Sequence, residues 1–237
     1  MYRERIDLTS RIGQWFGNGW MGIADLFLTA FCVFFSLSVH EFAHGFAAHN
    51  LGDDTAKNMG RLNLSPMSHL DPIGALCLFL FGFGWAKPVP VNPINFAPGK
   101  RKSGMVITSL AGPLSNLLTA FLSVFILHIL YAVYPVGTQG VVKTVFSVVV
   151  TLLYVMISMN IGLAVFNFIP IPPLDGSKIL NSVLPPRIYF KIMQYERYGF
   201  IVLILLINTP VFSRLLNTIS NLILSLFFWV IELIPFL

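Results

Sequence analysis

"SVHEFAHGFAAH", residues 38–49, places two imidazoles and a carboxylate on adjacent turns near the end of an apolar run. That run, residues 21–48, is long enough to cross a bilayer, which takes about 20 mostly apolar residues. An ionisable group at bilayer depth costs roughly 2.5–3.5 kcal/mol on insertion scales. Three such groups within two turns therefore need a compensating interaction, and a bound metal ion would provide one.

The spacing of these residues is that of a metal site. His40 and His44 are four residues apart, so a helix puts both rings on one face, where they can bind one tetrahedral metal ion. Glu41 lies about 100° further round the helix, in a position for a general base rather than a ligand. This is the H-E-x-x-H arrangement of zinc-dependent hydrolases. The alternative, a purely structural role, is disfavoured because so few His and Glu residues make a chance match rare.

A catalytic zinc usually has three protein ligands, so a third must come from elsewhere in the chain. His49 is nine residues beyond His40, roughly opposite it round the helix, and is a poor candidate. Asp175 is the better one, because it ends a later apolar run at the same membrane depth. Three prolines in "NFIPIPPLDG", residues 167–176, interrupt the helix just before it. The other interpretation of Asp175 is a simple turn after the membrane span.

The composition is that of an integral membrane protein. Only 11% of the 237 residues are charged, against about 25% in soluble domains, and the mean hydropathy is +0.77. The net charge of +5 lies in loops beside the spans and does not indicate nucleic-acid binding. We expect an all-α polytopic fold with four to five spans, at most six; the candidates are residues 21–48, 105–134, 145–174 and 215–237, with a short segment at 198–212.

Residues 73–86 form a different kind of segment. They are apolar and contain three glycines, but they are too short to span and lead into a proline-rich stretch. We expect a short membrane-embedded hairpin or re-entrant segment. Such a backbone persists at membrane depth only where it is buried in protein or lines a water-filled cavity.

The basic residues predict the orientation. Ten lie in the loops of residues 57–102 and 178–197, against four in the N-terminal segment and the turn at residues 134–144. The positive-inside rule then makes the first two loops cytoplasmic. We expect residues 1–20 to be an N-terminal tail and residues 21–237 a single integral-membrane domain, with its catalytic core at about 21–180.

Two asparagines lie inside apolar runs. Asn116 ends "AGPLSN", residues 111–116, and Asn167 lies eight residues before Asp175. Either amide can hydrogen-bond between helices, and either can hold a substrate backbone or a developing oxyanion. The sequence leaves both interpretations open.

Taken together, "HEFAH" (40–44), "GPLSN" (112–116) and "NFIPIPPLDG" (167–176) resemble the motifs of the site-2 proteases, which are intramembrane zinc metalloproteases. Residues 51–74 and 86–93 are similar to the compact prokaryotic branch, which lacks PDZ and CBS domains. The resemblance implies a three-helix catalytic core with a membrane-embedded hairpin after its first helix. From the candidate spans we expect one to three further helices at the C-terminal end.

The resemblance also implies the chemistry. One zinc per chain would be held by His40, His44 and Asp175, with Glu41 as the base. The enzyme would cleave within or near transmembrane segments of other membrane proteins, as in regulated intramembrane proteolysis. It would lie in the lipid bilayer of a prokaryotic plasma membrane, with its active site towards the cytoplasmic side. A metal transporter or sensor is the competing class, but it would spread its ligands along a path and would not need Glu41.

The remaining assignments come from the resemblance as well. It implies that Asn167 and Asn116 position the substrate or the oxyanion, with Asn116 supporting the site. His69, in "SHLDPIG" (68–74), would lie on the substrate side or be structural rather than bind zinc.

Overall fold

The computed structural model describes residues 20–81, 85–134, 139–180, 184–185, 187–188, 191 and 194–234. In this part of the chain four helices are long and apolar enough to cross a membrane. They are α2 (Trp20–Asn50), α6 (Arg101–Val133), α7 (Val141–Asn167) and α11 (Pro210–Glu232). The described residues contain no strand, so the all-α polytopic prediction is confirmed. The expected N-terminal tail falls on residues that lie almost entirely outside the description.

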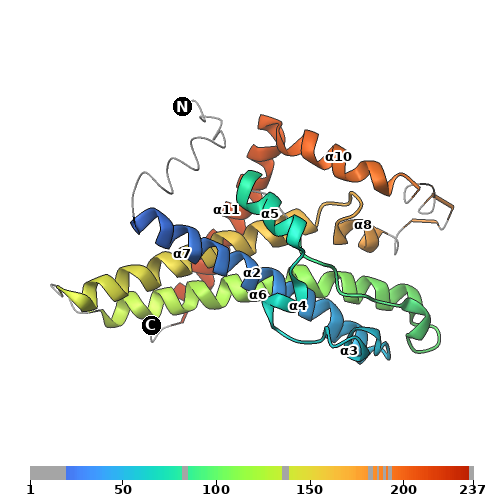
Figure 1. Ribbon diagram of the computed structural model, residues 1–237, viewed down its shortest axis with the longest axis horizontal. Helices are drawn as coiled ribbons and strands as arrows, with labels where there is room; N and C mark the ends of the chain where they lie inside the picture. Colours follow the sequence, from blue (N-terminus) through green and yellow to red (C-terminus); the bar gives the residue numbers. More distant parts are fainter. Residues whose placement is uncertain are drawn as a thin grey trace.

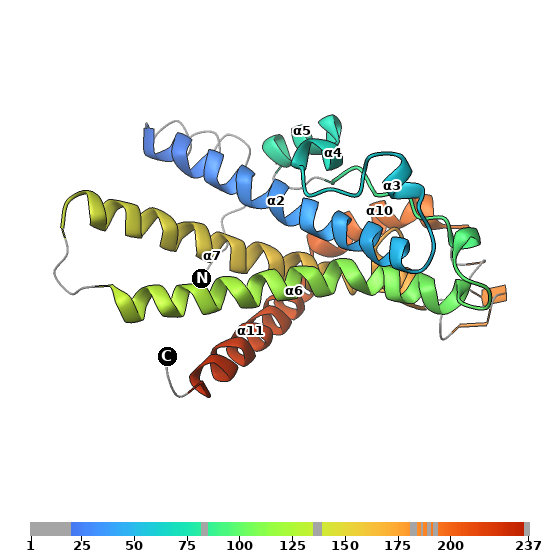
Figure 2. The same ribbon diagram turned by 90° about the horizontal axis from the view of Figure 1, so that it is seen from below.

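Helices α2, α6 and α7 form a three-helix bundle in which each contacts the other two (Figures 1 and 2). The chain runs along α2, returns along α6 and runs forward again along α7, so the end of α2 lies beside the start of α6. α11 contacts both α6 and α7. The three-helix core with C-terminal additions is therefore present.

One half of the bundle is apolar. Its buried cluster takes side chains from α6, α7 and α11: Ala120, Val124, Leu127, Leu153, Ile157, Ile161, Val165 and Ile231. Since lipid tails are as apolar as these side chains, close packing rather than water exclusion holds such helices together. The other half, nearer the end of α2, holds buried polar side chains instead.

The segment between α2 and α6 covers this polar half. It contains three short helices, α3 (Thr55–Asn58), α4 (Pro66–His69) and α5 (Pro72–Phe81), and the 3₁₀ turn η1 (Pro93–Asn95). α5 spans about 15 Å, half a bilayer, which fits the re-entrant alternative rather than a strand hairpin. One isolated antiparallel bridge, Leu70 to Ala86, closes its base, and residues 82–84 lie outside the description.

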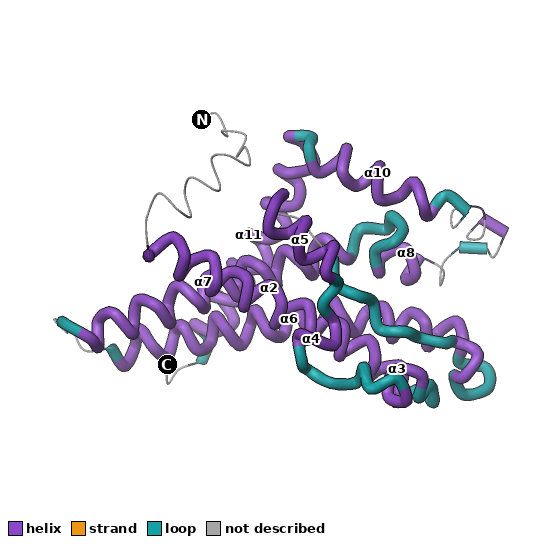
Figure 3. The backbone as a smooth tube through the Cα atoms, viewed as in Figure 1, coloured by secondary structure: helices purple, strands orange, loops and turns teal. Residues whose placement is uncertain are grey.

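Residues 85–97, here called the strap, are the extended loop that leads from α5 towards α6 (Figure 3). The strap lies against α2: Val89 N donates to the Glu41 carboxylate, and Ala97 N donates to Leu51 O. A Cβ on Gly45, one turn after Glu41, would lie 3.1 Å from Val89 Cγ1. The glycine therefore lets the strap approach this face of the helix.

The third span is shorter than the sequence suggests. The expected run of residues 145–174 ends as a helix at Asn167, because the prolines that follow cannot continue it. The chain then turns into α8 (Asp175–Leu180). α10 (Glu196–Ile207) has twelve residues and is too short to span by itself, so the described part of the chain has four helices long enough to span.

Packing in the apolar half can be tested with one residue type in two environments. Ile157 is 4% exposed within the cluster, whereas Ile126 on α6 is 46% exposed. Ile157→Ala should leave a cavity and lower stability, towards the lower end of the roughly 2–5 kcal/mol seen for Ile→Ala in cores. Ile126→Ala should have little effect, because lipid or detergent fills the space. Thermal unfolding in detergent measures both, and equal melting temperatures would contradict the packing described.

Candidate active site

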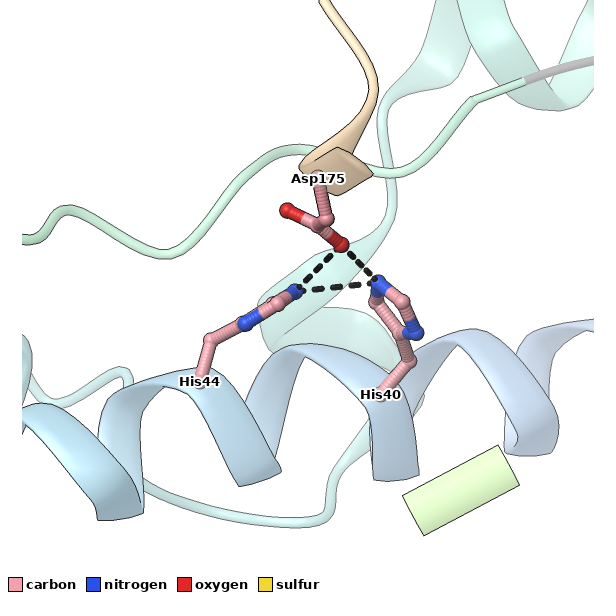
Figure 4. Close-up of side chains that lie close together, drawn as sticks. All are labelled: His40, His44 and Asp175. Carbon is pink, nitrogen blue, oxygen red and sulfur yellow. Dashed lines mark hydrogen bonds and ion pairs between the residues drawn. The ribbon is translucent and has the colours of Figure 1, made fainter. Parts of the chain in front are cut away.

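Three buried side chains converge where α2 meets α8 (Figure 4). His40 Nε2 lies 3.1 Å from Asp175 Oδ2, and His44 Nε2 lies 3.0 Å from the same oxygen. The two Nε2 atoms are 3.0 Å apart. Among the described residues, this group has the composition and spacing to hold a metal ion. The structure thus brings together the three residues that the sequence predicts as ligands.

Two glycines create the space for this group. A Cβ on Gly112 would lie 2.4 Å from His44 Nε2 and 2.6 Å from His40 Cε1, so α6 can approach the histidines only at a residue without a side chain. A Cβ on Gly176 would lie 2.4 Å from the carbonyl oxygens of Phe168 and Ile169. That second close approach lets α8 turn back against the end of α7, which carries Asp175 inward.

Hydrogen bonds behind the histidines fix their tautomers. His44 Nδ1 lies 2.6 Å from Thr108 O, a backbone acceptor, and must donate to it. His40 Nδ1 lies 2.7 Å from Asn116 Oδ1, whose amide nitrogen donates to Asn160 Oδ1. The Asn116 oxygen is therefore the acceptor for His40. Each neutral imidazole then carries its proton on Nδ1 and a lone pair on Nε2.

These tautomers decide what the cluster can do. With these neutral tautomers, two imidazole lone pairs and a carboxylate oxygen face one another at 3.0–3.1 Å, an arrangement that a bound cation makes favourable. Three ligands of a tetrahedral zinc, at 2.0–2.1 Å from it, lie about 3.3 Å from each other. The spacing and donor types therefore fit zinc. Hydrogen-bonded second ring nitrogens are also usual for zinc-binding histidines.

The charge on Asp175 suits the same role. Burial raises the pKa of this carboxyl, and the positive charge of Lys178 lowers it. Lys178 Nζ lies 3.2 Å from Oδ1, the oxygen that faces away from the histidines. Asp175 is thus anionic at neutral pH, and Oδ2 remains directed at the two rings.

Asn160 is a site residue that the sequence reasoning missed. It is fully buried in the middle of α7, accepts from Asn116, and donates to Ser36 Oγ at 2.8 Å and to Met156 O at 2.8 Å. It links all three core helices behind His40. The sequence could have indicated Asn160, because it is a single amide inside an apolar span and polar residues in membranes tend to mark functional sites.

Glu41 lies on a different face of α2 from the two histidines. It is half-buried, and its Oε2 accepts from Val89 N at 2.8 Å, so its contact is with the strap. It is adjacent to His40 in the chain but is not one of the three clustered groups. This is the placement expected for a residue beside a metal centre that is not a ligand.

The other predicted site residues lie apart from the cluster. Asn167 is the last residue of α7, half-buried, and its Nδ2 donates to Leu163 O in its own helix. His69 is buried at the end of α4; its Nε2 lies 2.8 Å from Asn63 O, and its Nδ1 has no hydrogen-bond partner among the described residues. Among the described residues, no hydrogen bond joins either side chain to the three clustered groups. Their roles remain predictions.

The comparison with known proteins decides the family. The family model described as "Peptidase family M50" matches residues 28–207, which include both histidines, Glu41 and Asp175. The chain belongs to peptidase family M50. Members of this family are intramembrane zinc metalloproteases, so the predicted class, a zinc-dependent protease of the membrane, is confirmed. The resemblance to site-2 proteases is confirmed with it.

Individual relatives agree. The chain is 42% identical over 186 residues to "Putative zinc metalloprotease YwhC" of Bacillus subtilis, covering 78% of this chain and 82% of the relative. It is 29% identical over 185 residues to a protein of Mycolicibacterium smegmatis named "Putative zinc metalloprotease Rip2", covering 76% and 66%. A Rip2 of Mycobacterium tuberculosis H37Rv is 26% identical over 204 residues, covering 84% and 70%. No solved structure gives a significant match.

The close approach of α6 to the histidines can be tested with two glycines. In Gly112→Ala the added methyl group would occupy the space between the rings, so zinc content should fall to background. Gly162→Ala makes the same change in helix α7, where a Cβ meets nothing within 4 Å. That control should retain zinc. Elemental analysis of both purified proteins makes the comparison, and full zinc in Gly112→Ala would contradict the geometry.

Proposed function

We propose that His40, His44 and Asp175 hold the zinc of this M50 peptidase, and that Glu41 is its general base. The enzyme would hydrolyse peptide bonds within or near transmembrane segments of other membrane proteins. The main support is that three buried acceptor atoms, the two Nε2 atoms and Asp175 Oδ2, lie 3.0–3.1 Å from one another. The inferred histidine tautomers leave no proton between the imidazoles. A partner cation gives this arrangement its energetic reason.

Zinc, when bound, supplies Lewis-acid chemistry and makes a water molecule at the site more acidic. Glu41 takes a proton from the attacking water while the oxygen of that water bonds to the scissile carbonyl carbon. Glu41 then returns the proton to the leaving nitrogen as the carbon–nitrogen bond breaks, giving a carboxylic acid and an amine. The hydrogen bond from Val89 N to Oε2 orients the carboxylate and leaves its other oxygen for this transfer.

The two asparagines would have separate tasks. Asn116 is engaged by His40 on one side and by Asn160 on the other, which supports an orienting role for His40 rather than direct contact with substrate. Asn167 lies at the end of α7, eight residues before Asp175, and uses one amide proton inside its own helix. Its remaining proton and its oxygen are the groups it could offer a substrate backbone.

The depth of the site supports a transmembrane substrate. The histidines lie on a membrane-spanning helix, and the surrounding bundle has no large soluble domain in the described part of the chain. A helical substrate hides its carbonyls in internal hydrogen bonds, so it must unwind before cleavage. The strap offers an extended backbone beside Glu41, against which an unwound segment can lie.

A substitution of the base separates a protease from a metal transporter or sensor. Glu41→Gln keeps the size of the side chain and leaves the three ligands intact, so zinc should remain. Cleavage of a purified transmembrane substrate should fall by roughly 10²–10⁴-fold, the usual worth of general-base catalysis. Glu232→Gln makes the same change at the far end of α11 and should leave turnover unchanged. Wild-type turnover in Glu41→Gln would contradict the role of Glu41 as the general base.

We further propose that the end of the bundle near the site faces the cytoplasm, because most basic residues lie in the loops at that end. After replacement of the two native cysteines, a single cysteine at Gln139 should react with a membrane-impermeant maleimide added outside intact cells. A single cysteine at Lys100 should react only after the cells are broken. The reverse pattern would invert the orientation.

A further inference from the structure

Asp53 is a fully buried carboxylate just beyond α2 with no part in the metal cluster. It accepts hydrogen bonds from Thr55 N at 3.1 Å and from the Thr55 hydroxyl, from Asn92 N at 2.6 Å and from Asn95 Nδ2 at 2.8 Å. Burial alone would raise the pKa of Asp53, but these hydrogen bonds outweigh it and hold the pKa below its ordinary value. The side chain is therefore an anion that accepts four hydrogen bonds, three on Oδ1 and one on Oδ2.

These contacts tie the C-terminal end of the strap to the end of α2. The other end of the strap is tied independently: Lys87 N donates to His69 O at 2.8 Å, and Lys87 O accepts from Arg61 Nη2 at 2.7 Å. Val89, which holds Glu41, lies between these two anchors. Its position along α2 is thus set from both sides.

The sequence around Val89 makes its position matter. Pro88 and Pro90 flank it, and neither has a backbone N–H, so Val89 is the one donor in residues 88–90. If the strap slipped by one residue in either direction, Glu41 would face a proline and lose its hydrogen bond. The two proline rings also fix φ on both sides of Val89. The short link from Val89 to Asn92 is therefore stiff, and anchoring Asn92 also holds Val89 in place.

We infer that Asp53 is a positioning residue for catalysis: by anchoring the strap at Asn92 and Asn95, it keeps the Val89 N–H on the Glu41 carboxylate. The inference rests on the proposed role of Glu41 as the base. It does not involve the zinc ligands, whose side-chain contacts go to α6, to Lys178 and to one another. Metal binding and base positioning therefore depend on different parts of the chain.

Two neighbouring aspartates provide the test. Asp53→Asn turns one acceptor into a donor that faces the N–H groups of the strap, whereas Asp54→Asn removes the same charge from an exposed side chain that contacts His49. Zinc content, kcat, KM and amide hydrogen exchange of residues 86–92 are measured on the zinc-loaded full chain. In Asp53→Asn we expect full zinc, faster exchange in the strap and a fall of about tenfold or more in kcat, with KM unchanged. Asp54→Asn should match the wild type.

The base variant shows whether the effect passes through Glu41. Asp53→Asn should cause no further loss of turnover in a Glu41→Gln background. If Glu41→Gln itself kept wild-type turnover, the proposed function would fail. If Glu41→Gln were inactive while Asp53→Asn kept full kcat, the positioning role alone would fail.

Two further outcomes also decide the inference. Loss of zinc from soluble, folded Asp53→Asn would overturn it, because Asp53 would then act on the metal centre. If Asp53→Asn does not fold, Asn95→Ala takes its place, since Asn95 is exposed and its loss removes a single hydrogen bond to Asp53. A partial fall in kcat with full zinc is expected there, and an unchanged kcat would overturn the inference.

Discussion

The polar half of this molecule is organised by one constraint: a polar group at membrane depth must find its partner inside the protein. His44 meets that constraint with the Thr108 carbonyl, and His40 meets it with Asn116, which in turn is held by Asn160. Each partner also fixes where the proton sits on the ring. The result is a pair of lone pairs aimed at Asp175, so that satisfying the second ring nitrogens prepares the first for a metal ion.

Helix α2 uses two of its faces for two tasks. The histidine face is closed by α6 at Gly112 and by α8, while the face with Glu41 and Gly45 receives the strap. Residues one position apart in the sequence therefore depend on segments that are far apart. The five-residue motif at residues 40–44 therefore needs two separate segments to complete the site: the loop between α2 and α6 contacts Glu41, and the turn after α7 brings Asp175 to the histidines.

Much of the site follows from local sequence. The four-residue spacing of the histidines sets one helical face, and Asp175 follows from the membrane depth at which its span ends. The length of α7 was overestimated because hydrophobicity continues to Leu174, whereas the helix stops at Asn167 ahead of the prolines. The strap contacts could not be predicted, since the hydrogen bonds from Val89 to Glu41 and from Asn92 to Asp53 join residues far apart in sequence. Periodicity carries no information about such pairs.

The proposed zinc site consists of two imidazoles and one carboxylate. Zinc K-edge X-ray absorption on the purified, zinc-loaded chain tests it most directly, because imidazole rings give a distinct outer-shell signal. We expect two imidazoles, no sulfur, and oxygen donors at about 2.0–2.2 Å, with a single imidazole left in His44→Ala. A third imidazole, a sulfur ligand at about 2.3 Å, or two imidazoles remaining in His44→Ala would contradict it.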